Sequence, residues 1–134
     1  MRKYLVIASV AFCALVSIGC GGDKAPANAS GAPSAKEGLL DLAALLKDVA
    51  ESKKSPPSRQ ADLQQYDAVY LSATLAITRG EVVYVWGAGL SGGTAVVAHE
   101  KEAPTAGGFV LLQDGTVKKL TAAEFAAAPK AAKK

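Results

Sequence analysis

Two basic residues at positions 2 and 3 precede an uncharged apolar run over residues 4–18, which leads directly to Gly19 and Cys20. As a helix this run would reach about 22 Å, whereas a bilayer core is roughly 30 Å thick. A positive start, an apolar stretch and a small residue before the cut are the three parts of a secretory signal. The sequence therefore predicts that residues 1–19 are a signal peptide, cleaved between Gly19 and Cys20, and that the fold is built from the rest of the chain.

The residues at the cut, Ser17-Ile18-Gly19-Cys20, resemble the bacterial lipobox, with Ser17 standing where that family has an aliphatic residue. The resemblance implies that the thiol of Cys20 is lipidated and that Cys20 becomes the new N-terminus. Several acyl chains, at about 0.8 kcal/mol per buried methylene, would anchor the chain stably to a membrane. Gly21 replaces the aspartate that marks inner-membrane retention in the family, which implies an outer-membrane protein facing the periplasm.

No free thiol is expected in the mature chain, because Cys13 lies in the apolar run that is removed and Cys20 is expected to carry the lipid. No disulfide, redox pair or thiolate metal site is then expected. The sequence has 15 Lys and Arg against 12 Asp and Glu, and without Arg2 and Lys3 the balance is 13 to 12. A nearly neutral chain gives no reason to expect a nucleic-acid partner.

Residues 20–35 contain no large aliphatic or aromatic side chain and are rich in glycine, alanine, serine and proline. This composition is typical of a flexible linker, with a reach of roughly 20 Å for about fourteen residues. We expect the segment to be the lipidated cysteine and its tether. One folded domain should follow over residues 36–125, and a disordered basic tail over residues 126–134.

The folded part is predicted to begin with an amphipathic helix. Its apolar stripe at helical spacing contains Leu39, Leu42, Ala43, Leu46, Val49 and Ala50. Ser34 and Glu37 have the spacing of a capping box, and the helix should end before the proline pair that follows residue 55. Leu40 and Leu45 widen the stripe, so the helix either packs deeply on a sheet or offers a surface to a partner.

Strand patterns dominate the rest of the domain, after a short helical turn expected at residues 62–66. Runs rich in β-formers lie at residues 73–78, 81–86, 94–100, 109–113 and 116–120. The run at 81–86 predicts a central strand because both of its faces are apolar. The fold class is therefore α+β, with one N-terminal amphipathic helix packed on a small antiparallel sheet of about five strands.

The connections between these runs carry turn signals of their own. Arg79-Gly80 suits a hairpin turn, and Asp114-Gly115 suits the two positive-φ positions of a type I′ turn. Residues 87–93 and 101–108 are expected to be loops. A last helical turn should start at Thr121, which has a glutamate three residues later.

The segment from residue 107 to residue 117, Gly-Gly-Phe-Val-Leu-Leu-Gln-Asp-Gly-Thr-Val, resembles the closing hairpin of planctomycete-type pseudopilin-like proteins. The resemblance implies a helix-then-sheet layout in a small bacterial lipoprotein. It also implies an alternative function, a pseudopilin-like subunit of a secretion system. The N-terminus departs from that family, since a lipid-type signal stands in place of the prepilin segment that docks into a filament.

The side chains give little sign of catalysis. His99 is the sole histidine, and Ser91 lies in a glycine-rich loop without the flanking pattern of a nucleophile elbow. A small serine hydrolase that uses Ser91 and His99 is a second alternative. No Gly-Lys-Ser/Thr follows the glycines of residues 87–93, so no phosphate-binding loop is expected. We expect no enzyme, no cofactor and no metal ion.

Tyr70, Tyr84 and Trp86 are the side chains best suited to a recognition surface, because aromatic anchors dominate binding when they are exposed and rigidly held. The alternative is that they belong to the core. Taken together, these features predict a lipid-anchored envelope protein that acts as a non-catalytic interaction or structural module. Its expected partners are the membrane, through the lipid on Cys20, and an envelope protein or polymer of unknown identity.

Overall fold

The computed structural model describes residues 33–133 as a mixed fold of helices and one antiparallel sheet of four strands. The predicted signal peptide, the lipidation of Cys20 and most of the tether lie outside these residues. In chain order the elements are α1 (Ala35–Glu51), the 3₁₀ helix η1 (Gln60–Tyr66), α2 (Leu71–Thr78), β1 (Val82–Tyr84), β2 (Val96–Glu100), α3 (Ala103–Ala106), β3 (Gly108–Leu112), β4 (Val117–Leu120) and α4 (Ala122–Ala127).

Helix α1 begins at the predicted capping box. The backbone N–H of Glu37 donates to Ser34 Oγ at 3.3 Å, and the N–H of Ser34 donates to Glu37 Oε2 at 2.6 Å. Two of the free N–H groups of the first turn are thereby satisfied. The helix starts where the sequence places its cap, and it ends at Glu51, five residues before Pro56.

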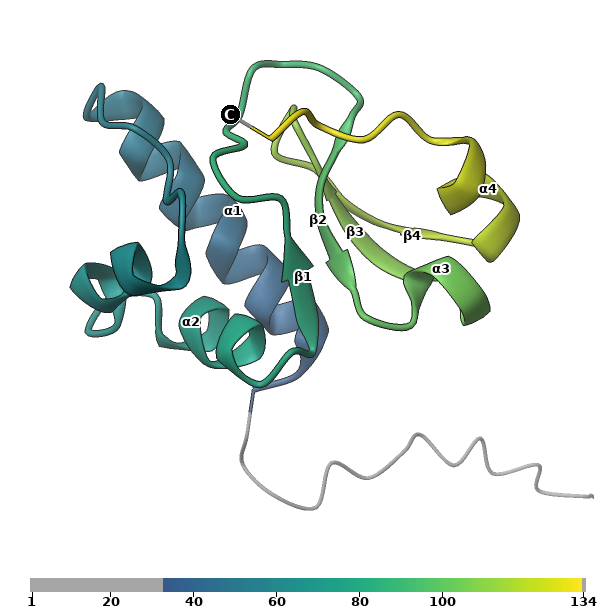
Figure 1. Cartoon of the computed structure of the whole chain (residues 1–134), viewed down its shortest axis with the longest axis horizontal. Coiled ribbons are helices and arrows are strands. Elements are labelled where there is room, and N and C mark those ends of the chain that lie inside the picture. Colours follow the sequence, from purple (N-terminus) through teal and green to yellow (C-terminus); the bar gives the residue numbers. More distant parts are fainter. Residues whose placement is uncertain (1–32, 134) are drawn as a thin grey trace, which may run out of the picture.

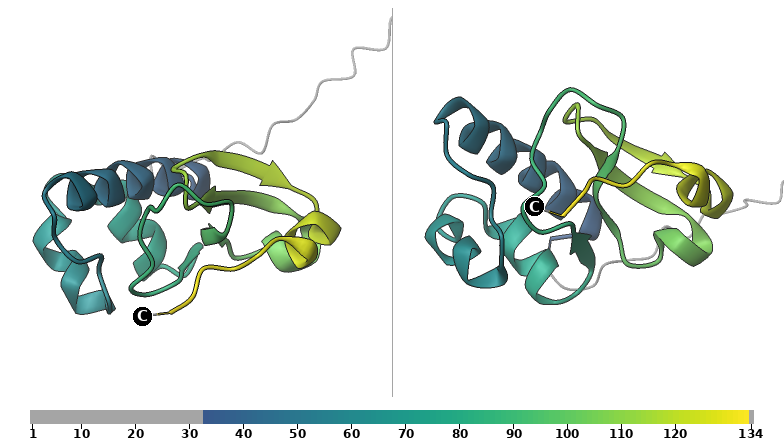
Figure 2. Two further views of the ribbon diagram at one scale, coloured as in Figure 1. Left: turned by 90° about the horizontal axis from the view of Figure 1, so that it is seen from above. Right: turned by 45° about the horizontal axis from the view of Figure 1, so that its top comes forward.

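Most of the apolar stripe of α1 is buried, but Ala43 is half-buried, and Ala50 and Leu40 are exposed. Leu39, Leu42 and Leu45 have no exposed surface, and Leu46 and Val49 are 1% exposed. These side chains pack between α2 and the sheet, and Figures 1 and 2 show α1 running along one side of the strands. Burial of each leucine contributes about 2 kcal/mol, so the helix is held by its packing.

The strand predicted at residues 73–78 is wrong, because this segment belongs to helix α2. Only the two threonines and the isoleucine of the run Ala-Thr-Leu-Ala-Ile-Thr favour a strand, whereas its alanines and leucine favour a helix. The buried residues Ala73 and Ala76 are three apart, which is a helical spacing. Their small side chains allow α2 to approach α1 closely. At the closest point Gly38 faces Ala76, and a Cβ on Gly38 would collide with it.

Helix α2 receives its N-terminal cap from α1. Its own N-cap residue, Tyr70, makes no side-chain cap. Instead Asp41 Oδ2 of α1 accepts the N–H of Ala73 at 3.1 Å, across 32 residues of sequence. A carboxylate at a helix N-terminus satisfies a free donor and interacts favourably with the helix dipole.

The sheet has the strand order β1-β2-β3-β4, and every pair is antiparallel. Strand β1 is therefore at an edge, and the prediction that residues 81–86 form a central strand is wrong. Val82 and Tyr84 are buried while Val83 between them is 42% exposed. On the second face of this run Val83 is exposed, whereas Val85 is half-buried against the large core.

The predicted hairpin of β3 and β4 is confirmed, but its turn is not type I′. Among the described residues only Lys53 and five glycines have positive φ, so Asp114 does not, whereas Gly115 has φ +86°. The carbonyl of Leu112 accepts the N–H of Gly115 at 3.0 Å, and the N–H of Leu112 donates to the carbonyl of Thr116 at 3.0 Å. This is a three-residue loop with glycine in its left-handed position.

A register shift in β2 directs two consecutive side chains of the strand to the same face of the sheet. Val96 pairs with Leu112 and Ala98 pairs with Leu111, so two steps along β2 correspond to one step along β3. Val97 and Ala98 consequently join the large core with Leu111 on the α1 face. Val96 joins the smaller core on the other face, where Val110 and other residues pack with Phe125 of α4.

Of the segment 126–134 that we predicted to be a disordered tail, the structure describes residues 126–133, and these are docked on the domain. The N–H of Val96 donates to the carbonyl of Pro129 at 2.8 Å, and the N–H of Ala131 donates to the carbonyl of Val96 at 2.9 Å. Ala131 is 9% exposed within the large core. Backbone pairing and this one methyl group are enough to dock a segment that has no large apolar residue (Figure 1).

Lys130 secures the same tail from the other side. Its ammonium group donates to the carbonyls of Phe125 and Ala128 and lies 4.0 Å from the centroid of the Phe125 ring. A cation at the end of a helix compensates the free carbonyls there. The predicted capping box of Thr121 and Glu124 at the start of α4 is also confirmed.

Asp41→Ala should lower the free energy of unfolding by about 1 kcal/mol, because the cap of α2 is lost. Asp41→Asn should lose less, since an amide oxygen can still accept the N–H of Ala73. Urea unfolding of the two variants measures the difference. Equal stability of the wild type and Asp41→Ala would show that the contact between α1 and α2 does not depend on this cap.

Candidate functional site

A half-open groove lies where the C-terminal end of α1 meets the connection between β1 and β2. Its volume is about 330 Å³. The lining residues are Leu46, Val49, Ala50, Lys54, Pro56, Ala88, Gly89, Leu90, Ser91, Gln113 and Ala132. We call this the α1-end groove. Figures 1 and 2 show the C-terminal segment beside the β1–β2 connection.

The loop that forms one wall of the groove is tied to the hairpin of β3 and β4. The N–H groups of Ser91 and Gly92 both donate to the carbonyl of Gln113, at 2.9 and 3.0 Å. Close to this point the Cβ of any residue other than glycine at position 93 would lie 2.7 Å from Gln113 Oε1. The fold therefore holds this loop in a defined position, although the loop has no regular secondary structure.

The proline segment forms the opposite wall and is held from two sides. The carbonyl of Pro57 accepts the N–H of Gly87 at 2.8 Å. Pro56 lies so close to Gly89 that a Cβ there would be 2.8 Å from the proline Cγ. The glycine at position 89 thus permits the two segments to pack closely within the lining of the groove.

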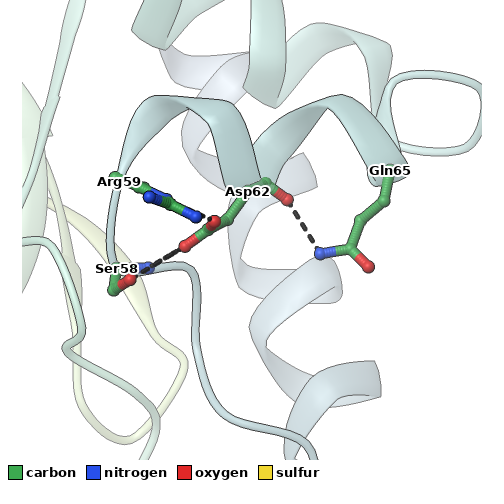
Figure 3. A network of polar contacts seen from close by, with 4 residues as sticks. All are labelled: Ser58, Arg59, Asp62 and Gln65. Carbon is green, nitrogen blue, oxygen red and sulfur yellow. Dashed lines mark hydrogen bonds and ion pairs between the residues drawn. The ribbon is translucent and has the colours of Figure 1, made fainter.

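A polar network fixes the proline segment to η1, as Figure 3 shows. Asp62 Oδ2 accepts the N–H of Ser58 at 3.0 Å and its hydroxyl at 2.8 Å, and Oδ1 accepts Arg59 Nε at 3.0 Å. The amide of Gln65 donates to the carbonyl of Asp62 at 2.9 Å. The hydrogen bond from Arg59, followed by those from Ser58, lowers the pKa of Asp62 to about 2.

Lys54 reaches the groove because of how α1 ends. Lys53 has φ +55°, and the N–H groups of Lys53 and Lys54 donate to the carbonyls of Ala50 and Val49 at 3.1 and 2.9 Å. This is a Schellman motif with lysine in place of the usual glycine. It satisfies two carbonyls at the end of the helix. It also reverses the direction of the chain, so that Lys54 lies in the groove lining directly after the last helical turn.

The polar side chains of the groove have free functional groups. Within residues 33–133, no hydrogen bond or ion pair involves the ammonium group of Lys54, the hydroxyl of Ser91 or the side-chain amide of Gln113. The rest of the lining consists of apolar side chains and glycine. An apolar floor with a few available polar groups is the usual composition of a binding pocket.

The three predicted recognition residues do not form one surface. Tyr84 is 4% exposed, its hydroxyl donates to the carbonyl of Ala88, and burial raises its pKa. Trp86 is half-buried and packs edge-on against Tyr84 at 5.2 Å between ring centroids. Tyr70 instead pairs with Tyr66 at 6.4 Å, and its partial burial, with the charges of Asp48 and Asp41, raises its pKa.

Ser91 and His99 do not come together. Ser91 lines the α1-end groove before β2 begins. His99 lies near the far end of β2, where its ring packs against Phe125 at 4.7 Å and its Nδ1 is 2.7 Å from the carbonyl oxygen of Glu100. The geometry therefore does not supply the contact between nucleophile and base that a serine hydrolase requires.

Sequence patterns did not point to the groove, although Ser91 was considered for another role. Lys54 and Pro56 come from the connection between α1 and η1, Gln113 comes from the turn between β3 and β4, and none belongs to a sequence motif. The positive φ of Lys53 places Lys54 in the groove lining, but a pair of lysines in the sequence does not indicate such a turn. Only the packing of loops that are distant in sequence brings these residues together.

Comparisons with known proteins give no further guidance. The chain matches no protein family, and no curated protein or solved structure is significantly similar to it. Over residues 33–133 no helix is long and apolar enough to span a bilayer. The same part of the chain contains no group of three or more His, Cys, Asp or Glu side chains placed to hold a metal ion.

The Asp62 network should make stability depend on acid pH. The carboxylate has a lower pKa in the folded chain than its ordinary 3.8, so its stabilising effect is complete above about pH 4 and is lost as the pH falls toward 2. Asp62→Asn should remove this part of the dependence. Urea midpoints between pH 2 and pH 6 test the prediction, and parallel pH profiles for the two proteins would contradict it.

Proposed function

We propose that this chain is a lipid-anchored protein of the bacterial envelope that acts as a non-catalytic interaction module, and that it contacts its partner through the α1-end groove. The observation that carries the proposal is the groove itself. It combines apolar side chains from α1 and the loops with three polar side chains whose functional groups are free of other described residues. Such a surface can bind without performing chemistry.

The groove replaces the aromatic surface as the proposed contact. An aromatic anchor contributes most when it can be buried by a partner, and Tyr84 is already buried within its own chain. Leu90, by contrast, is half-buried in the groove wall. Binding there would complete the burial of existing apolar surface without unfolding any core.

The lipid anchor supports the same role by confining the groove to the membrane surface. A tether of about fourteen residues allows a reach of roughly 20 Å. Attachment by acyl chains keeps the domain near envelope components and raises its effective concentration toward them. The alternative of a serine hydrolase is not supported by the geometry, because Ser91 and His99 are not paired, whereas the alternative of a secretion-system pseudopilin remains untested.

The anchor is tested by intact-mass spectrometry of the protein isolated from bacterial membranes. We expect a chain that begins at Cys20 and carries the added mass of several acyl chains. Cys20→Ser should abolish the added mass, because a hydroxyl does not replace the thiol as the acceptor. An unmodified Cys20 or a different N-terminus would contradict the proposed anchoring.

The groove is tested by photo-cross-linking in the native envelope, with a benzoylphenylalanine at position 90 of the full chain and, as control, at position 123. Ala50 and Ala44 are both exposed on α1, but only Ala50 lines the groove. Ala50→Trp should fill the groove and remove the adduct formed from position 90, while Ala44→Trp should leave it unchanged. Adducts that survive Ala50→Trp, or that form equally from position 123, would contradict the groove as the contact.

A further inference from the structure

The α1-end groove carries charge of one sign only, which is positive. Lys54 is its single charged lining residue, and Ser91 and Gln113 are its neutral polar side chains. The described ion pairs involve Lys47 with Glu51 and Arg59 with Asp62, so Lys54 has no carboxylate partner within residues 33–133. An unpaired ammonium group beside apolar surface is complementary to a ligand that joins an apolar group to an anion.

The end of α1 does not oppose an anion at this place. A helix C-terminus normally presents free carbonyls, which repel negative charge. Here the carbonyls of Val49 and Ala50 already accept the N–H groups of Lys54 and Lys53. The Schellman motif therefore leaves two fewer free carbonyls to repel an anion beside Lys54.

The shape of the groove favours a protein segment over a free small molecule. Its volume of about 330 Å³ is at the lower end of the range for ligand pockets. One side is open to solvent, so a free ligand would keep part of its apolar surface in water. A side chain delivered by a partner protein would be covered on the open side by the partner itself.

We propose that the α1-end groove binds a partner segment in which a large apolar side chain stands next to a carboxylate. The apolar group packs on Leu46, Val49 and Leu90, and the carboxylate pairs with Lys54. This inference rests on the proposed function and specifies the chemistry of its contact. It excludes segments that are purely apolar or positively charged next to the anchor.

The carboxylate is tested with N-acetylphenylalanine and its neutral amide, which have the same side chain and nearly the same shape. Each compound is titrated into the membrane-extracted protein in detergent, followed by NMR of the amides of residues 88–92. We expect the acid to bind with a dissociation constant of about 1 mM. The amide should bind at least about threefold more weakly, as expected for loss of a partly exposed ion pair.

Two lysine variants separate the groove charge from general electrostatics. Lys54→Met should reduce binding of the acid to the level of the amide, whereas Lys47→Met, on the exposed side of α1, should leave the difference intact. Equal affinities of acid and amide in the wild type, or a difference that survives Lys54→Met, would overturn the carboxylate proposal. The cross-linking test from position 90 does not depend on the charge of Lys54. Failure of the carboxylate proposal would therefore leave the proposed function standing, and the proposed function would fail only if the cross-link is also independent of the groove.

Discussion

The leucine stripe of α1 is the interaction on which the rest of the structure depends. Its side chains are buried from two directions, by α2 on one flank and by the sheet on the other. The same helix caps α2 through Asp41 and forms the groove at its C-terminal end. A change in the position of α1 would therefore alter the core, the second helix and the candidate site together.

The parts of the fold that could be predicted from sequence are those set by local interactions. Ser34 with Glu37, and Thr121 with Glu124, mark helix starts because both members of each capping box are close in the chain. The hairpin of β3 and β4 is likewise local. Residues 73–78 were predicted wrongly because their three β-branched residues were given more weight than their alanines and leucine, which favour the helix that packs against α1.

The candidate site was less predictable than the fold, for the same physical reason. The aromatic residues were chosen for their chemistry, but Tyr84 fills the core and Tyr70 packs beside α1. The docked tail depends on a backbone pairing with Val96 across more than thirty residues, and its poor composition concealed it. Groove residues such as Lys54 and Gln113 become neighbours only after the loops have packed, so their proximity is a product of tertiary structure.

The central claim is that a membrane-tethered domain presents one groove to a partner. Hydrogen–deuterium exchange of the protein in native envelope vesicles, compared with the same protein purified in detergent, tests it most directly. The account predicts slower exchange in the vesicles at the C-terminal end of α1 and in residues 87–93, with α4 and β4 unchanged. Slower exchange confined to α4 and β4, or the same exchange in both preparations, would contradict it.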